Sequence, residues 1–109
     1  MEIRLMEVEP MVDIAIRTRN SYYIFRLTEP KACRGILSGG RLGTTPRKAF
    51  LASTFRPANC RISKLDQLET GYRAMFYLEG SGTHILTTSV ITELGFAVTQ
   101  TTQSSPEDC

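Results

Sequence analysis

Alternation of apolar and polar side chains is the feature of this sequence that most constrains its fold. It is clearest in residues 12–27, VDIAIRTRNSYYIFRL, where an Arg-Asn-Ser connection separates two alternating stretches. A period of two places successive side chains on opposite faces of a strand, and β-branched and aromatic residues favour strands. Asn20 tolerates the positive φ that a tight turn requires. The segment therefore predicts a β-hairpin.

Further strands are predicted on both sides of the middle of the chain. Glu29-Pro30 is expected to end the second strand, and residues 34–37 then read as a third, short strand before Gly39-Gly40. Residues 72–78, YRAMFYL, alternate again, and Gly-Ser-Gly at 80–82 connects them to a last strand region at 83–94. We therefore expect a second hairpin in this part of the chain.

Two segments predict short helical turns. Thr45-Pro46 resembles an N-cap followed by proline at the first helical position, so residues 46–53 are expected to form two helical turns. A strand is the alternative for this segment. Residues 55–61 read as a loop, and apolar residues then recur at every third position across 62–68, which suggests one helical or 3-10 turn.

Together these elements indicate a mostly β fold. About six short strands suggest a small antiparallel barrel or a strongly curled sheet with one or two short helical turns, because closure removes exposed edges. Consecutive hairpins make a meander the expected topology. Residues 1–98 are expected to form a single compact domain, whereas 99–109 are polar and predicted to be a disordered tail.

Several function classes lack their sequence signals. The first residues are acidic and contain no long apolar run, and no run approaches the roughly 20 residues of a membrane span, so no membrane partner and a cytoplasmic location are expected. Cys33, Cys60 and Cys109 lack C-x-x-C spacing, which disfavours a disulfide framework or a zinc site. Cys33 and Cys60 are expected to be small, semi-buried residues, and Cys109 an inert thiol, with intermolecular pairing as the alternative. No cofactor or metal is expected.

Catalysis is not expected either. The chain has one histidine, His84, and a general base needs a nucleophile and an orienting acid. Ser89 and Glu93 are available nearby, but no nucleophile motif surrounds them. The neighbouring Thr87-Thr88 pair is typical of a strand.

Charge is unevenly distributed, although the net charge is only +2. The segment from Lys31 to Lys64 contains no acidic residue. Its basic residues are Lys31, Arg34, Arg41, Arg47, Lys48, Arg56, Arg61 and Lys64. Such a segment is either a solvated face, paired in part with the acidic last third, or a surface that attracts anions.

The glycine-rich stretch at 38–48, SGGRLGTTPRK, is the sharpest candidate for an anion site. Glycines expose backbone N–H groups, and the predicted helix N-terminus and basic side chains would add positive potential. The spacing is not that of a P-loop, and a simple inter-strand connection is the alternative. The candidate anion-binding residues are Gly39, Gly40, Arg41, Gly43, Thr45, Arg47 and Lys48.

These observations predict a non-catalytic binding or regulatory module. Its expected partner is anionic, either a nucleic acid or a phosphorylated ligand, contacted through the basic middle segment. One alternative is a protein-interaction or homodimerisation module. A second alternative is a small ligand-binding or enzymatic barrel, which would need a deep pocket with convergent polar groups.

Overall fold

Short β-strands and single 3-10 turns make up the regular structure. The computed structural model describes residues 1–56, 59–80 and 84–97, and for 59–64 it describes the path of the backbone alone. In chain order the elements are β1 (Glu2–Arg4), η1 (Leu5–Glu7), β2 (Val12–Thr18), β3 (Tyr22–Glu29), η2 (Pro30–Ala32), β4 (Arg34–Gly39), η3 (Gly40–Leu42), β5 (Arg47–Arg56), β6 (Asn59–Lys64), β7 (Gln67–Glu69), β8 (Arg73–Leu78), β9 (His84–Thr87) and β10 (Ile91–Phe96). The mostly β prediction is confirmed.

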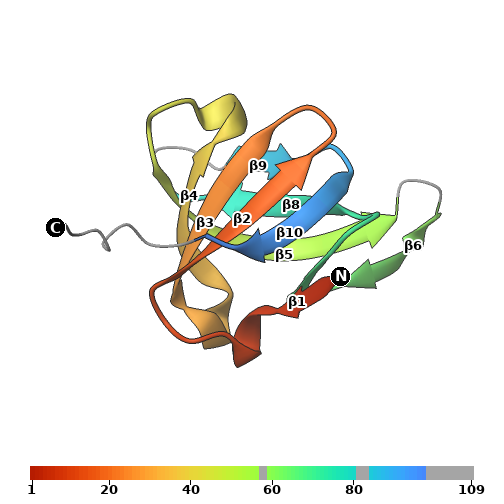
Figure 1. Ribbon diagram of the computed structural model, residues 1–109, viewed down its shortest axis with the longest axis horizontal. Coiled ribbons are helices and arrows are strands. Elements are labelled where there is room, and N and C mark those ends of the chain that lie inside the picture. Colours follow the sequence, from red (N-terminus) through yellow and green to blue (C-terminus); the bar gives the residue numbers. More distant parts are fainter. Residues whose placement is uncertain (57–58, 81–83, 98–109) are drawn as a thin grey trace, which may run out of the picture.

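The strands form two antiparallel sheets (Figure 1). The large sheet has the order β10-β2-β3-β4-β5-β8-β9, and β6 pairs with the far half of β5. The small sheet joins β1 to β7, with Ile3 opposite Leu68. Most neighbours in the large sheet are also neighbours in sequence, as a meander requires. The strands are more numerous than expected because several are only three or four residues long.

The predicted hairpin at 12–27 is confirmed as β2 and β3. Its register places Ile14 opposite Phe25 and Ile16 opposite Tyr23, and all four side chains are buried. The N–H of Thr18 donates to the carbonyl of Ser21 across the turn, at 2.8 Å. The third strand is also confirmed and extends to Gly39, and β8 pairs with β9 as the second hairpin predicts.

Both predicted helical turns after residue 45 are wrong. Residues 47–56 form the longest strand, β5, which pairs with β4 and β6 on one edge and with β8 on the other. Burial of Ala49, Leu51 and Thr54 and pairing on both edges stabilise the strand over a local helix. Residues 59–64 form β6 and residues 67–69 form β7, so most of the predicted loop and turn is also strand.

The last strand region divides into two strands that belong to opposite ends of the sheet. Its first part, β9, pairs with β8, and its second part, β10, pairs with β2. At the junction the N–H of Thr88 donates to Ala74 and the N–H of Ile91 donates to Tyr72. The chain thereby passes from one end of the sheet to the other without a long loop.

The large sheet is strongly curled, which agrees with one form of the prediction. Phe25 of β3 and Phe76 of β8 are separated by two strands along the sheet, yet their rings meet with centroids 5.1 Å apart. In the part of the chain that the structure describes, no ladder joins β9 to β10, so a closed barrel is not confirmed. The inner face of the curl holds the core.

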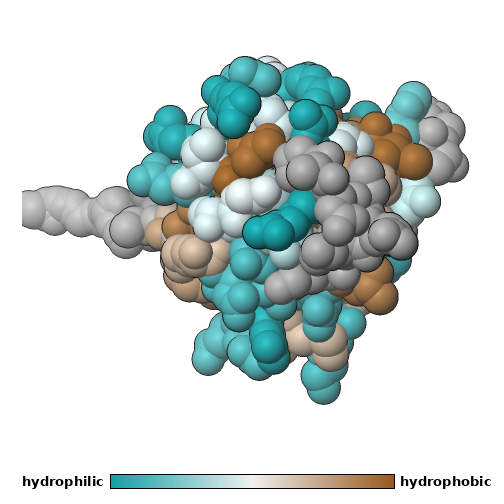
Figure 2. Space-filling model, turned by 90° about the vertical axis from the view of Figure 1, so that its right-hand side faces the viewer, coloured by the Kyte–Doolittle hydropathy of each residue, from teal (hydrophilic) through white to brown (hydrophobic). Residues whose placement is uncertain are grey.

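The outer surface is mainly hydrophilic on the side shown in Figure 2, where apolar residues form separate patches among the coloured atoms. None of the described segments is a helix long and apolar enough to cross a membrane. The polar tail predicted at 99–109 lies outside the described residues, as do residues 81–83 of the second hairpin connection.

Candidate functional site

The glycine-rich loop is shaped by packing against the preceding hairpin. Gly39, Gly40 and Gly43 have φ values of 90°, 50° and 63°, in the region that favours glycine. A Cβ on Gly40 would lie 2.3 Å from ring atoms of buried Tyr23, and one on Gly39 would lie 2.5 Å from the carbonyl oxygen of Tyr22. Close backbone approach therefore explains two of the three glycines.

The backbone donors of this loop are partly used within it. The N–H of Gly43 donates to Gly40 at 3.1 Å, and the N–H of Thr45 donates to Leu42 at 3.3 Å. The helix N-terminus expected after Thr45 does not form, because β5 begins at Arg47. One feature that suggested an anion cradle, the helix N-terminus, is thus absent from this loop, and another, the set of free backbone N–H groups, is reduced.

The three cations proposed for the anion site have different surroundings. Arg41 donates from Nη2 to the carbonyl of Thr87 on β9, whereas Arg47 donates from Nη2 to the carbonyl of Glu79 at 3.0 Å. Lys48 is exposed and follows Arg47 on a strand, so the two side chains leave opposite faces. The structure does not bring all three together, and anion binding here stays a prediction.

Other basic residues of the middle segment also contact neighbours. The Nε of Arg34 lies 3.0 Å from a carboxylate oxygen of Glu79. The guanidinium of Arg56 lies over the Tyr72 ring, 5.7 Å from its centroid. Lys31 and Lys48 are exposed and have no ion pair with another described residue. The described part of this segment is therefore not one continuous surface of free cations.

The residues considered for catalysis are engaged in separate contacts. Ser89 accepts a hydrogen bond from the side-chain amide of Asn20 at 3.2 Å, and Glu93 pairs with Arg17 at 3.2 Å. His84 is exposed at the start of β9. Across residues 1–56, 59–80 and 84–97, no cluster of three or more His, Cys, Asp or Glu residues is arranged to hold a metal ion.

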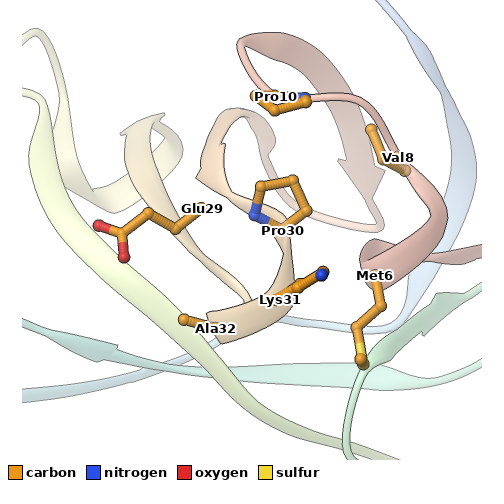
Figure 3. A pocket seen from close by; sticks show the side chains of 7 residues that line it. All are labelled: Met6, Val8, Pro10, Glu29, Pro30, Lys31 and Ala32. Atoms are coloured by element: carbon orange, nitrogen blue, oxygen red, sulfur yellow. The ribbon is translucent and has the colours of Figure 1, made fainter.

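An apolar groove lies between the two 3-10 turns η1 and η2, which pack side by side (Figure 1). Its volume is about 430 Å³, against 200–230 Å³ for three other surface hollows. We call it the Met6–Pro30 groove. It is lined by Met6, Val8, Pro10, Glu29, Pro30, Lys31 and Ala32. Figure 3 shows Pro30 at its centre, with Pro10 and Val8 on one side and Met6 on the other.

The η1 wall of the groove is fixed by one buried neighbour. Leu5 is fully buried, and its N–H donates to the carbonyl of Asp66 at 2.9 Å. The N–H of Val8 closes the turn by donating to Leu5 at 3.1 Å. With Leu5 directed into the core, the next side chain, Met6, remains 50% exposed at the groove.

The η2 wall is fixed in the same way by Cys33. The residue is buried, its N–H donates to Pro30 at 3.0 Å, and its carbonyl accepts from the N–H of Leu51 at 2.9 Å. Burial, with a smaller contribution from the negative charge of Asp66, raises the pKa of the Cys33 thiol. The packing of Cys33 in the hydrophobic core agrees with the semi-buried role expected for it.

Two non-glycine residues with left-handed backbone conformation flank the groove. Met11, directly after Pro10, has φ 69°, and Cys33, directly after Ala32, has φ 54°. Each such residue costs roughly 1–2 kcal/mol. The N–H of Met11 donates to Leu27 at 2.7 Å, so tertiary contacts hold both turns in place. The groove is consequently a shaped feature of the fold.

Sequence reasoning did not single out this groove. In the sequence, Glu29 and Pro30 indicate only the end of a strand, and Met6, Val8 and Pro10 belong to no recognised motif. The lining comes from two turns that the sheet brings together, so no spacing in the sequence marks it. Its apolar side chains offer burial to a ligand, and two charged residues, Glu29 and Lys31, also line it.

Comparisons of the chain with protein-family models, with curated proteins and with solved structures give no match.

Proposed function

We propose that this chain is a non-catalytic protein-interaction module, and that the Met6–Pro30 groove buries apolar side chains of its partner. The observation that carries this proposal is the groove itself. Its volume of about 430 Å³ lies within the range of roughly 300–1,000 Å³ found for ligand sites. Five of its seven lining residues are apolar, namely Met6, Val8, Pro10, Pro30 and Ala32.

Exposed methionines next to the groove support a protein partner. Met6, which lines the groove, is 50% exposed, and Met11, which directly follows the lining residue Pro10, is 58% exposed. Methionine is unbranched and polarisable, which lets it adapt its shape to different apolar contacts. Exposed apolar residues that surround a concave site are typical of interaction surfaces.

A peptide selection tests this function. Random 16-residue peptides displayed on phage are selected on the full chain, and binders are then made synthetically with a fluorescent label. We expect binding that the Ala32→Trp variant, which fills the groove, weakens at least tenfold. Met6→Glu, which puts a charge on the opposite wall, serves as a second variant, and thermal unfolding checks that both remain folded.

The matched control is Ile85→Glu. Ile85 is 54% exposed on β9 and does not line the groove, so the substitution makes a similar change in surface hydropathy elsewhere. Peptides that lose affinity equally in Ile85→Glu and Met6→Glu bind through nonspecific apolar contact. That result, or the absence of any selected peptide, would contradict the proposed function.

A further inference from the structure

We infer that the open edge of β9 binds an extended segment of a partner protein, which adds a strand to the large sheet and carries an acidic residue beside Arg41. We call this surface the β9 edge. It is separate from the Met6–Pro30 groove, because no residue that lines the groove belongs to β9. Binding at either surface can therefore fail while binding at the other stands.

The hydrogen-bond pattern shows which backbone groups of β9 face outward. Thr88 donates its N–H to Ala74, at 2.9 Å, and in an antiparallel ladder such bonded residues alternate with residues whose backbone groups point the other way. The register runs along β9 without a shift, so Leu86 is the next residue that bonds to β8. The N–H and C=O groups of Ile85 and Thr87 consequently point away from β8.

One independent contact agrees with this direction. The C=O of Thr87 accepts a hydrogen bond from Nη2 of Arg41, which lies in the η3 turn and not on β8. Since β9 ends the strand order, no described strand pairs with this side of it (Figure 1). Both backbone groups of Ile85 and the N–H of Thr87 therefore lack a strand partner among the described residues.

The β9 edge lacks several features that protect the edges of sheets. Within β9 there is no proline, lysine or bulge, and Ile85 is 54% exposed. The opposite edge strand, β10, differs in both respects. Its ladder with β2 shifts register between Ile91 and Glu93, and Leu94 is only 8% exposed. The β9 edge is thus the more accessible of the two.

The side chains along the β9 edge indicate the chemistry of the partner strand. Ile85 lies opposite Tyr77, which lies opposite Phe50, so an apolar side chain of the partner strand would extend this row. Arg41, at the Thr87 end, is exposed and has no ion pair with another described residue. Its charge favours an acidic side chain at that end.

A second copy of this chain fits the β9 edge less well than such a partner. Antiparallel pairing of two β9 strands would place the sequence His-Ile-Leu-Thr opposite itself. That sequence contains no acidic residue to pair with Arg41. The inferred partner is therefore a different protein.

The test uses the peptide acetyl-Asp-Thr-Val-Thr-Val-Thr-Asp-amide, labelled with a fluorophore, and fluorescence anisotropy with the full chain. An extended peptide of this sequence has its valines on one face, and its two aspartates place an acid near Arg41 in either strand direction. We expect binding that Ile85→Pro weakens at least tenfold, because proline removes an outward N–H and none that bonds to β8.

Phe96→Pro is the matched control on the opposite edge. Phe96 is also 54% exposed, and the N–H of Ala97 donates to Asp13, so the N–H of Phe96 likewise points away from the neighbouring strand. This variant should bind the peptide as the unchanged chain does. Thermal unfolding checks that both proline variants remain folded.

Two changes in the peptide test the ladder and the charge without altering the fold. N-methylation of alternate residues should abolish binding in one alternation and preserve it in the other, because only every second N–H faces β9. Arg41→Gln should weaken binding of the aspartate peptide several-fold, but should not affect a peptide in which asparagine replaces both aspartates.

Each part of the inference has a result that overturns it. Strand addition is wrong if the peptide does not bind at millimolar concentration, if both N-methylated forms bind alike, or if Phe96→Pro weakens binding as much as Ile85→Pro. The acidic residue is wrong if Arg41→Gln affects both peptides equally. Dimerisation that Ile85→Pro abolishes would identify a second copy as the partner. Sensitivity to Ala32→Trp would place the peptide in the groove instead.

Discussion

Phe25 and Phe76 lie on strands β3 and β8, with β4 and β5 between them in the sheet, yet their rings meet edge to face with centroids 5.1 Å apart. Both side chains are fully buried. Such a contact is available only because the sheet curls until its inner face meets itself. The pair therefore reports directly on the curvature of the fold.

A double-mutant cycle of Phe25→Leu and Phe76→Leu should show positive coupling. Each single substitution removes ring contacts in the core, and edge-to-face pairs contribute about 0.5–1.5 kcal/mol beyond area burial. The free energy of unfolding of the four proteins in urea measures the coupling. Additive losses would mean that the two rings do not stabilise each other.

Alanine substitutions of two loop glycines should have different costs. Gly40→Ala would place a Cβ 2.3 Å from the Tyr23 ring at φ 50°, so strain from overpacking adds to backbone strain, together about 2–5 kcal/mol. Gly43→Ala also has positive φ, at 63°, with ψ −131°, but no atom lies within 4 Å, which leaves backbone strain alone, about 1–3 kcal/mol. If chemical unfolding showed the same loss of unfolding free energy in both variants, this would contradict the close packing of Gly40 on Tyr23.

Arg47→Ala should destabilise the fold more than Lys48→Ala. Arg47 donates to the Glu79 carbonyl from a half-buried position, and a hydrogen bond from a charged group contributes roughly 1–2 kcal/mol when partly screened. The Lys48 side chain is exposed and has no hydrogen bond or ion pair with another described residue, so its loss should change stability by less than about 0.5 kcal/mol. Thermal unfolding of both variants checks this; a reversed order would argue against the structural role of Arg47.

Cys33 should react slowly with thiol reagents at neutral pH. In a Cys60→Ser, Cys109→Ser background, alkylation by N-ethylmaleimide should be at least about tenfold slower in the folded chain than in urea, because the thiol is buried and protonated. Mass spectrometry follows the reaction. Equal rates would show that the thiol is accessible.

The same group predicts how stability depends on pH. The folded thiol holds its proton more tightly than the unfolded one, whose ordinary pKa is 9.0. Above that pH the unfolded chain binds fewer protons than the folded chain, so the free energy of unfolding falls as pH rises toward the folded pKa. In the same background, the free energy of unfolding of the Cys33→Ala variant should fall less over this pH range. If the free energy of unfolding falls equally steeply with pH in both proteins, other groups cause the decrease.

The parts of the fold that could be predicted were those fixed by local pattern. Residues 12–27 alternate with a period of two, and that period places Ile14, Ile16, Tyr23, Phe25 and Leu27 on the buried face. It did not predict that Asp13, on the other face, is also buried. Residues 46–53 were misjudged because Thr45-Pro46 is a good local start for a helix, whereas pairing with β4 and β8 outweighs it. The sequence does not show which strands will flank that segment.

The candidate site was harder to predict than the fold. The glycines at 39 and 40 suggested a phosphate loop, but their role in the structure is close approach to Tyr22 and Tyr23. The Met6–Pro30 groove has no motif, because two turns separated by a whole hairpin meet only after folding. Shape produced by tertiary packing does not appear in the spacing of residues.

The division of the last strand region has a consequence for how the molecule is made. The strand β2 is synthesised early. Its partner on one edge is β10, where Leu94 lies opposite Ile16, and β10 comes after every other strand of the large sheet in the sequence. Sheets that depend on such non-local pairing fold slowly, in roughly milliseconds to seconds. A growing chain on the ribosome therefore presents the edge of β2 to neighbouring chains until its final strand arrives, and that interval is when mispairing is most available.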